Sequence, residues 1–153
     1  MAALQPPQAL LVVTDTTQGM EFGIDAHVWT LGAKFEGLHS ISAGLHLLTF
    51  APGGVAGREG VFIDCVGGGV HRQRWDVQNE CLGSCSLNDA QSESLEAAAR
   101  AGALTLAPYP RNHARVWAAV ASIIDVATLQ RCNLRLDEAF GPGGIDGERG
   151  ERE

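Results

Sequence analysis

The stretch that decides the fold is Gly19-Met20-Glu21-Phe22-Gly23-Ile24-Asp25-Ala26-His27-Val28-Trp29, continued by Gly32-Ala33-Lys34-Phe35-Glu36-Gly37. Large aromatic residues alternate here with charged residues and repeated glycines. The apolar run from Met20 to Ile24 predicts a short strand, and Asp25 is a turn-prone residue that would end it. The stretch contains neither a nucleophile paired with a base nor a set of metal ligands. We therefore interpret it as a rigid, turn-rich surface feature of the kind that a partner recognises.

Further apolar runs in the first half of the chain predict more strands. Glycine or proline residues separate these runs, which cover residues 9–13, 45–50, 61–66 and 70–77. Because three glycines at 67–69 lie between the last two runs, those runs predict a β-hairpin. Along its second arm, alternation places Gln73 and Trp75 on one face and Arg72 and Arg74 on the other. Short strands separated by such breaks predict an antiparallel sandwich or a small barrel.

The second half of the chain changes to a helical pattern. Asn88 and Gln91 have the spacing of a capping box ahead of an alanine-rich run, and Gly102 marks the end of that predicted helix. Pro110 suits the first position of another helix. Apolar residues recur beyond it at spacings of three and four, which predicts one helical face that packs on the sheet. The members of this face are His113, Val116, Trp117, Val120, Ile123, Ile124 and Ala127.

Together these patterns predict an α+β fold, in which an antiparallel β-sandwich-like N-terminal part carries two C-terminal helices packed on it. Trp75 and Trp117 are expected to be core aromatics that join the hairpin to the second helix. A chain of 153 residues is long enough for one domain with a sizeable core, which we place at residues 1–140. Residues 141–153 are rich in glycine and charge, so we expect a flexible tail or a truncated linker there.

The composition limits the kind of partner. The chain carries 18 acidic and 11 basic residues, and its net charge of −7 disfavours direct binding to a phosphate backbone. We therefore expect a protein partner and no direct nucleic-acid contact. No apolar run approaches the roughly 20 residues of a membrane span, so we expect no membrane association.

No recognisable signal peptide precedes the four cysteines, Cys65, Cys81, Cys85 and Cys132. They are therefore expected to be thiols in a reducing compartment, the cytosol or the nucleus. Cys81 and Cys85 are close enough in sequence to share a metal with His71 and Cys65, and this mixed site is an alternative use of the thiols.

The sequence lacks the motifs of common catalytic sites. It contains no Gly-x-Ser-x-Gly, and the glycine-rich residues 53–60 lack the Gly-Lys-Ser/Thr end of a phosphate-binding loop. His39 and His46 could lie on adjacent strands as in a cupin metal site, but the close His-x-His pair and the downstream glutamate of such a site are missing. We therefore predict a protein that is not an enzyme and holds no cofactor or metal. The alternative is a cupin-like β-sandwich that binds a metal or a small ligand.

A series of motifs occurs in an order and at separations that resemble those of a known family. It comprises Gly19-x-Glu21-Phe22-Gly23-Ile24-Asp25, Trp29, Gly32-x-Lys34-Phe35-x-Gly37, Gly44-x-His46 and Pro108-Tyr109-Pro110. The series resembles the N-terminal domain of the Aar-two splicing-factor family, closely over residues 19–50 and more loosely over 104–127. The chain departs from the family at Ser42-Ala43, where family members commonly carry Pro-Pro.

The resemblance implies a function that composition does not give. Members of the family are non-enzymatic, chaperone-like assembly factors of the U-five small nuclear ribonucleoprotein. They bind the RNase-H-like and Jab/MPN-type domains of the large spliceosomal scaffold protein Prp-eight, and they hold off the Brr-two helicase until maturation. Their β-sandwich-like N-terminal domain precedes a helical domain, and this chain would stop where the helical domain begins. We expect a Prp-eight-like partner, a role in pre-mRNA splicing, and location in the nucleus and the cytoplasm.

Seven residues of the opening stretch form the candidate site: Glu21, Phe22, Gly23, Asp25, Trp29, Lys34 and Phe35. In one interpretation they contact the partner, with the aromatic residues as anchors, because aromatic side chains dominate binding energy at protein interfaces. In the other, the aromatic residues fill the core of the sandwich, while Gly23 and Asp25 build a turn. We favour the second interpretation for the aromatic residues, and both stay open for the charged ones.

Overall fold

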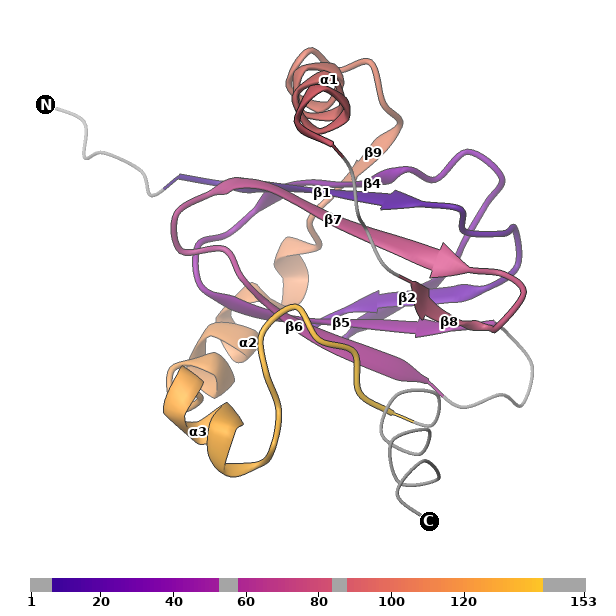
Figure 1. The fold of residues 1–153 in the computed structure, drawn as a ribbon. Helices are drawn as coiled ribbons and strands as arrows, with labels where there is room; N and C mark the ends of the chain where they lie inside the picture. Colours follow the sequence, from indigo (N-terminus) through magenta and orange to yellow (C-terminus); the bar gives the residue numbers. More distant parts are fainter. Residues whose placement is uncertain (1–6, 53–57, 84–87, 142–153) are drawn as a thin grey trace, which may run out of the picture.

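A computed structural model of the chain describes residues 7–52, 58–83 and 88–141. In these ranges two β-sheets stack face to face, and helices flank them on opposite sides (Figure 1). The strands are β1 (Ala9–Thr14), β2 (Glu21–Ile24), β3 (His27–Thr30), β4 (Gly37–Ile41), β5 (Leu45–Ala51), β6 (Glu59–Asp64), β7 (Gly69–Asp76), β8 (Cys81–Gly83) and β9 (Leu106–Pro108). The helices are α1 (Asp89–Arg100), the short 3-10 helix η1 (Arg111–His113), α2 (Ala114–Ala121) and α3 (Val126–Arg131). The predicted α+β, sandwich-like fold is confirmed.

The two sheets differ in how their strands pair. The four-stranded sheet has the order β3-β2-β5-β6, and its pairs are antiparallel, as the sequence predicts. The five-stranded sheet has the order β8-β7-β1-β4-β9 and is mixed, because β1 runs parallel to β7 and β4 runs parallel to β9. Each parallel pair joins strands that are far apart in the chain, and such long-range pairing leaves no mark on a local hydrophobic pattern.

The predicted hairpin of the two glycine-linked runs is wrong. β6 pairs with β5 in one sheet, whereas β7 pairs with β1 and β8 in the other. The chain passes between the sheets through Gly68 and Gly69, whose φ angles are 72° and 84°. Glycines with positive φ suit a link between sheets as well as a hairpin turn, so composition alone does not separate the two. The predicted alternation within β7 is confirmed, because Gln73 and Trp75 are its buried residues.

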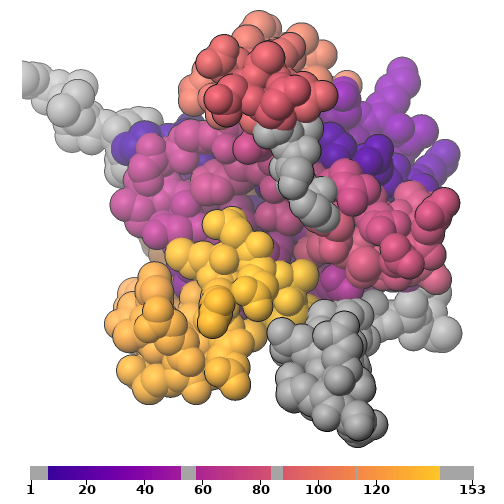
Figure 2. All heavy atoms as spheres, in the orientation of Figure 1, coloured from indigo at the N-terminus to yellow at the C-terminus, as the bar shows by residue number. Residues whose placement is uncertain are grey.

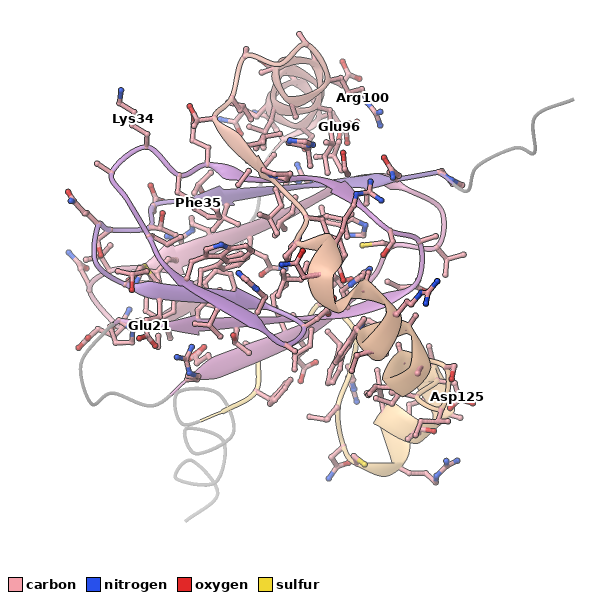
Figure 3. All side chains as sticks on the ribbon, turned by 180° about the vertical axis from the view of Figure 1, so that it is seen from behind. Glu21, Lys34, Phe35, Glu96, Arg100 and Asp125 are labelled. Atoms are coloured by element: carbon pink, nitrogen blue, oxygen red, sulfur yellow. The ribbon has the colours of Figure 1, made fainter. Side chains whose placement is uncertain are left out.

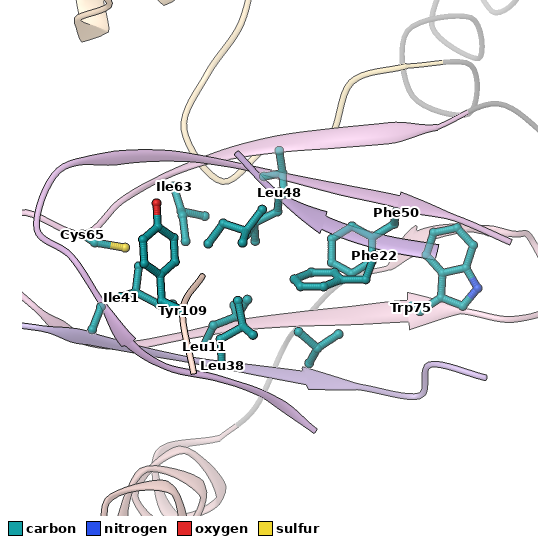
Figure 4. Close-up of a cluster of buried hydrophobic side chains, with 14 of the residues drawn as sticks. Leu11, Phe22, Leu38, Ile41, Leu48, Phe50, Ile63, Cys65, Trp75 and Tyr109 are labelled. Carbon is teal, nitrogen blue, oxygen red and sulfur yellow. The ribbon is translucent and has the colours of Figure 1, made fainter. Parts of the chain in front are cut away.

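The core lies between the sheets and is built around Phe22 (Figure 4). The centroid of the Phe22 ring is 5.9 Å from that of Trp29, 5.2 Å from that of Phe35 and 5.1 Å from that of Phe50. Phe22 is fully buried, and Trp29 and Phe35 pack half-buried against it. Trp75 of the other sheet stacks on Phe50, as expected of a core aromatic. Since burying one such side chain contributes roughly 2 to 3 kcal/mol, the aromatic residues of the opening stretch help to hold the sandwich together.

Helix α1 begins and ends where the sequence predicts. The side chain of Asn88 accepts a hydrogen bond from Gln91 N, and the side chain of Gln91 accepts one from Asn88 N, which completes the capping box. Beyond the helix, Gly102 has a φ of 76°, a conformation that favours glycine. The helix lies across the outer face of the five-stranded sheet (Figure 1), and Ala99 is its one buried residue.

The long helix predicted after Pro110 is wrong, because η1, α2 and α3 occupy that region in succession. The chain leaves the helical path at residues 122–125, where the side chain of Asp125 accepts a hydrogen bond from Thr128 N at 2.7 Å and caps α3. A capping residue of this kind starts a new helix and therefore prevents the previous one from continuing in register.

The predicted apolar face of this region is largely exposed. Val116 is 63% and Ile123 is 79% exposed. Trp117 is half-buried instead of lying in the core, and its Nε1 donates a hydrogen bond to the carbonyl oxygen of Leu45 at 2.8 Å. The side chain of His113 lies outside the described residues. Regular spacing indicates which residues share a helical face, but it does not indicate what covers that face.

Two other expectations concern the ends and the thiols. The predicted tail lies outside the described residues from position 142 onward. Cys65, Cys81 and Cys132 are free thiols, as expected, and Cys85 lies outside the described part of the chain.

Across the described ranges, every helix is too short or too polar to span a bilayer.

Glu59 is a buried acid that connects the edges of the two sheets. It lies in β6 with 4% of its surface exposed, and its Oε1 accepts a hydrogen bond from Leu82 N of β8 at 3.1 Å. Its Oε2 is buried without a hydrogen-bond partner among the described residues. Burial raises the pKa of Glu59, against a smaller lowering effect of the bond from Leu82 N. The charged form of this carboxylate therefore destabilises the folded state.

We predict that Glu59→Gln raises the free energy of unfolding at neutral pH by on the order of 1 kcal/mol. The amide oxygen still accepts the bond from Leu82 N, and no charge is buried. Because the pKa of Glu59 in the folded state lies above its ordinary value of 4.5, stability falls as the pH rises through the interval between the two values. The gain from the substitution should therefore be small below about pH 4 and should grow as the pH rises.

Urea unfolding measured from acidic to neutral pH tests this expectation. Glu93→Gln makes the same chemical change at an exposed position of α1 and serves as the control. A gain for Glu59→Gln that is independent of pH, or no greater than that of the control, would contradict the assignment.

Candidate functional site

Three motifs of the sequence meet at the carboxylate of Asp25. Asp25 forms the turn between β2 and β3 with a φ of 57°, a conformation that Asp adopts more readily than most other non-glycine residues. The turn directs its side chain inward, where 3% remains exposed. The backbone N of Asp25 donates to Leu47 O at 2.7 Å, and its Oδ1 accepts from Leu47 N at 3.0 Å. These two bonds fix the turn to β5.

The second carboxylate oxygen, Oδ2, contacts two buried rings. His46 Nδ1 lies 2.7 Å from it, and the hydroxyl of Tyr109 donates to it at 2.5 Å. The two rings also meet edge to face with 5.2 Å between their centroids. Asp25 and His46 belong to the four-stranded sheet, whereas Tyr109 directly follows β9 of the other sheet. The group of Asp25, His46 and Tyr109, here called the carboxylate cluster, therefore joins the two sheets inside the core.

The surroundings of His46 determine where its protons lie. Its Nε2 is 2.7 Å from the backbone carbonyl oxygen of Ser42, which only accepts hydrogen bonds, so Nε2 carries a proton. Its Nδ1 faces Asp25 Oδ2, which also accepts from the hydroxyl of Tyr109, while Oδ1 of the same carboxylate accepts from Leu47 N. The geometry therefore describes a buried acid–base pair between Asp25 and His46.

The motif Pro108-Tyr109-Pro110 holds the tyrosine in the carboxylate cluster. Tyr109 N donates to His39 O of β4 at 2.9 Å, and the prolines on either side restrict the backbone around it. Burial raises the pKa of Tyr109, and the bond to Asp25 raises it further. The hydroxyl therefore stays protonated at neutral pH and acts as a donor to Asp25.

With Ser42 included, the site resembles a Ser-His-Asp triad, because Ser42 Oγ lies 3.4 Å from His46 Nε2. A general base has to accept the serine proton, but Nε2 already carries a proton and donates it to the Ser42 carbonyl oxygen. Cys65 does not replace the serine, because burial, with the charges of Asp64 and Asp25, raises the pKa of its thiol to about 12. The arrangement suits a structural role for the Asp25–His46 pair and not a hydrolytic site.

Two glycines of the motifs allow the strands to approach. A Cβ atom at Gly23 would lie 2.5 Å from Thr49 Oγ1, and one at Gly37 would lie 1.9 Å from Leu11 O. Gly23 therefore gives β5 room beside β2 and does not form the turn, in contrast to one interpretation of the sequence. The turn itself is built by Asp25, as that interpretation also holds.

Among the seven candidate contact residues, Glu21 and Lys34 carry exposed charge (Figure 3). Glu21 forms an ion pair with Arg58 in which the side chains are 39% and 40% exposed. Lys34 is exposed in the turn that precedes β4. The aromatic members lie in or against the core, and Asp25 lies in the carboxylate cluster. Contact of Glu21 and Lys34 with a partner stays a prediction.

His39 and His46 do not form the pair that a cupin-type site needs. Their strands, β4 and β5, belong to different sheets instead of lying side by side, and both ring nitrogens of His46 have protein partners. Within the described ranges, no three side chains of His, Cys, Asp or Glu lie close enough together to hold a metal ion. Cys85 of the mixed thiol site lies outside those ranges, so that site stays untested.

Sequence patterns did not predict the carboxylate cluster, although each of its members belongs to a different motif of the series. The sequence predicts Asp25 at a turn or a contact surface, and it offers His46 as a metal ligand of a cupin-like site. A usable signal was the presence of isolated polar residues in strand-like, apolar surroundings. Because a buried polar group needs a partner, several such residues in one small domain are expected to meet in its core.

We predict that Asp25→Asn lowers the free energy of unfolding by roughly 3 kcal/mol. Asn tolerates the same positive φ and keeps an acceptor for Leu47 N, so the substitution chiefly removes the charge that pairs with His46. Tyr109→Phe removes one hydrogen bond to that charge and should cost roughly 2 kcal/mol. The double variant should cost less than the sum, because both changes act on the same carboxylate.

Urea unfolding followed by circular dichroism measures these differences. Asp64→Asn is the matched control, since Asp64 is exposed and an Asn there keeps an acceptor for its bond from Val66 N. If Asp25→Asn and Tyr109→Phe cost no more than the control, the carboxylate cluster does not hold the sheets together.

Comparison with known proteins agrees with the motif series. The family model described as AAR2 N-terminal domain matches residues 7–134 of this chain. Protein AAR2 homolog of Homo sapiens is 28% identical over 129 residues, which cover 80% of this chain and 34% of that protein. The Mus musculus protein of that name is 29% identical over 129 residues, which again cover 80% of this chain and 34% of that protein. The Caenorhabditis elegans one is 28% identical over 123 residues, again 80% of this chain and 34% of that protein. This chain thus spans about a third of the length of the curated relatives it matches, and because the family model covers most of its residues, it belongs to the AAR2 family through the N-terminal domain.

Proposed function

We propose that this chain is a non-catalytic protein-binding domain that acts in the assembly of a spliceosomal ribonucleoprotein by binding a Prp-eight-like scaffold protein. Family membership over residues 7–134 carries the proposal. Because the match covers about a third of each relative, the domain would supply one part of the assembly activity. On the same basis we expect it in the nucleus and the cytoplasm.

The chemistry of the buried site supports binding over catalysis. His46 has both ring nitrogens occupied by acceptors, and the Cys65 thiol is protonated at neutral pH. A polar group of this kind contributes to a defined, rigid frame, which favours binding because little order is lost on association.

The surface supports a protein partner. The net charge of −7 opposes contact with a phosphate backbone. The segment of η1, α2 and α3 forms a lobe on the opposite side of the sandwich from α1 (Figure 2). Val116, Val120, Ile123 and Val126 expose between 41% and 79% of their surface on this lobe. Exposed apolar side chains on one part of a surface are typical of protein interaction sites.

We predict that the immobilised chain captures the RNase-H-like or the Jab/MPN-type domain of a Prp-eight-like scaffold, and that Ile123→Asp weakens capture at least about tenfold. Ile123 is 79% exposed, so the substitution should leave the free energy of unfolding unchanged. Val66→Asp places the same charge at an exposed valine on the β6–β7 link, where 62% of its surface is accessible, and should leave capture intact.

Surface plasmon resonance with both scaffold domains gives the affinities. Absence of capture by this chain and by a longer version that includes a following helical domain would refute the proposed function. If both substitutions weaken capture equally, the helical lobe is not the interface.

A further inference from the structure

We propose that the groove between α1 and the five-stranded sheet binds an acidic peptide segment of a partner protein. The groove has a volume of about 580 Å³ and opens to solvent beside the C-terminal half of α1. Four polar side chains line it: those of Gln8, His39, Ser40 and Arg100. The inference goes beyond the proposed function and does not depend on it.

An irregularity of β4 places two of these side chains at the groove. Ala9 and Leu11 of β1 pair with Ile41 and Leu38 of β4, so two residues of β4 face the single residue Leu10. This β-bulge contains His39 and Ser40, and both line the groove where a regular strand would present one side chain. Ser40 has a φ of 62°, which is unfavourable for serine, and such backbone strain is concentrated at binding sites in proteins.

The polar groups of the groove are hydrogen-bond donors. Arg100 donates only, and the side chains of Gln8 and Ser40 each carry at least one donor. His39 Nδ1 lies 2.8 Å from Ser40 Oγ, and in either neutral tautomer of the ring this pair keeps one proton free, on His39 Nε2 or on the hydroxyl of Ser40. Donors that line one groove, with no acid among its lining residues, suit the binding of a carboxylate.

The charge at the groove is opposite to that of the whole chain. No Asp or Glu is among the residues that line it, although the chain carries a net charge of −7. Glu96 lies one helical turn before Arg100 on α1 (Figure 3), but within the described part of the chain it forms no ion pair with it. Arg100 is exposed and therefore available to a carboxylate of another molecule.

The apolar lining distinguishes a peptide from a bare anion. Leu10, Leu104 and Leu106 line the groove and are half-buried, so part of each leucine side chain lacks a packing partner. A peptide that carries leucine next to glutamate would cover these side chains and present its carboxylates to Arg100 and to the His39–Ser40 pair. Phosphate would meet the donors but would leave the leucines exposed.

Titration of the ¹⁵N-labelled chain with the blocked peptide acetyl-Leu-Glu-Leu-Glu-amide tests the proposal by NMR. We expect saturable shifts of the backbone amides of Leu10, Ser40, Gly102, Leu104 and Leu106. The peptide acetyl-Leu-Gln-Leu-Gln-amide, which has the same shape without charge, should bind at least about tenfold more weakly. Inorganic phosphate at the same concentration and ionic strength should not reproduce the shifts of the leucine amides.

Two variants examine the donors. Arg100→Gln should weaken the acidic peptide at least about tenfold, whereas Arg115→Gln, the same change at an exposed position of α2, should not. Ser40→Gly removes the hydroxyl but suits the positive φ, so it should weaken binding without lowering the free energy of unfolding. Because both positions are tested in folded protein, loss of binding reports on the groove itself.

Equal binding of the acidic and neutral peptides, equal sensitivity to Arg100→Gln and Arg115→Gln, or shifts at the groove with phosphate as strong as with peptide would each overturn the proposal. Absence of any shift at the groove would do the same. If the groove fails these tests while the scaffold domains are still captured, the proposed function stands alone. If the peptide binds and the scaffold domains are not captured, the groove stands alone.

Discussion

The carboxylate of Asp25 receives hydrogen bonds from two segments that lie far apart in the chain. Leu47 N and His46 belong to β5, and Tyr109 follows the last strand of the opposite sheet. A charge with 3% exposure is tolerated only if it is fully paired, so each donor depends on the others being in place. The constraint is geometric as well as energetic, because the three partners reach one carboxylate only when the sheets face each other in this register.

This constraint explains why the opening stretch identifies a family better than it identifies a binding surface. Phe22 fills the core, Gly23 and Gly37 permit close strand contacts, and Asp25 anchors the carboxylate cluster. What remains at the surface is the charge of Glu21 and Lys34. Because most residues of this motif are buried, the motif indicates the fold. Contacts with a partner are therefore expected on other surfaces of the molecule.

Local patterns predicted those features that local physics decides. The capping box at Asn88 and Gln91, the strands at the start of the chain and the inward face of β7 were all predictable, because each follows from neighbouring residues. The failed hairpin and the broken helix after Pro110 share a different cause. A glycine link does not specify which strand comes next in space, and an apolar helical face does not specify a partner. The carboxylate cluster needed both kinds of long-range information, since its members are 21 and 84 residues apart along the chain.

The carboxylate cluster is also connected to the helical lobe, because both contact the start of β5. Leu45, whose carbonyl oxygen accepts the Trp117 bond, directly precedes His46, and Ser42 supplies the carbonyl that holds His46 Nε2. The start of β5 is therefore held from one side by the buried Asp25–His46 pair and from the other by α2. Since Trp117 makes this bond from a helix with no fully buried residue, the position of α2 depends on a few contacts at that point. Loss of the Asp25–His46 pair would therefore loosen the residues that precede His46, and with them the point at which Trp117 holds α2.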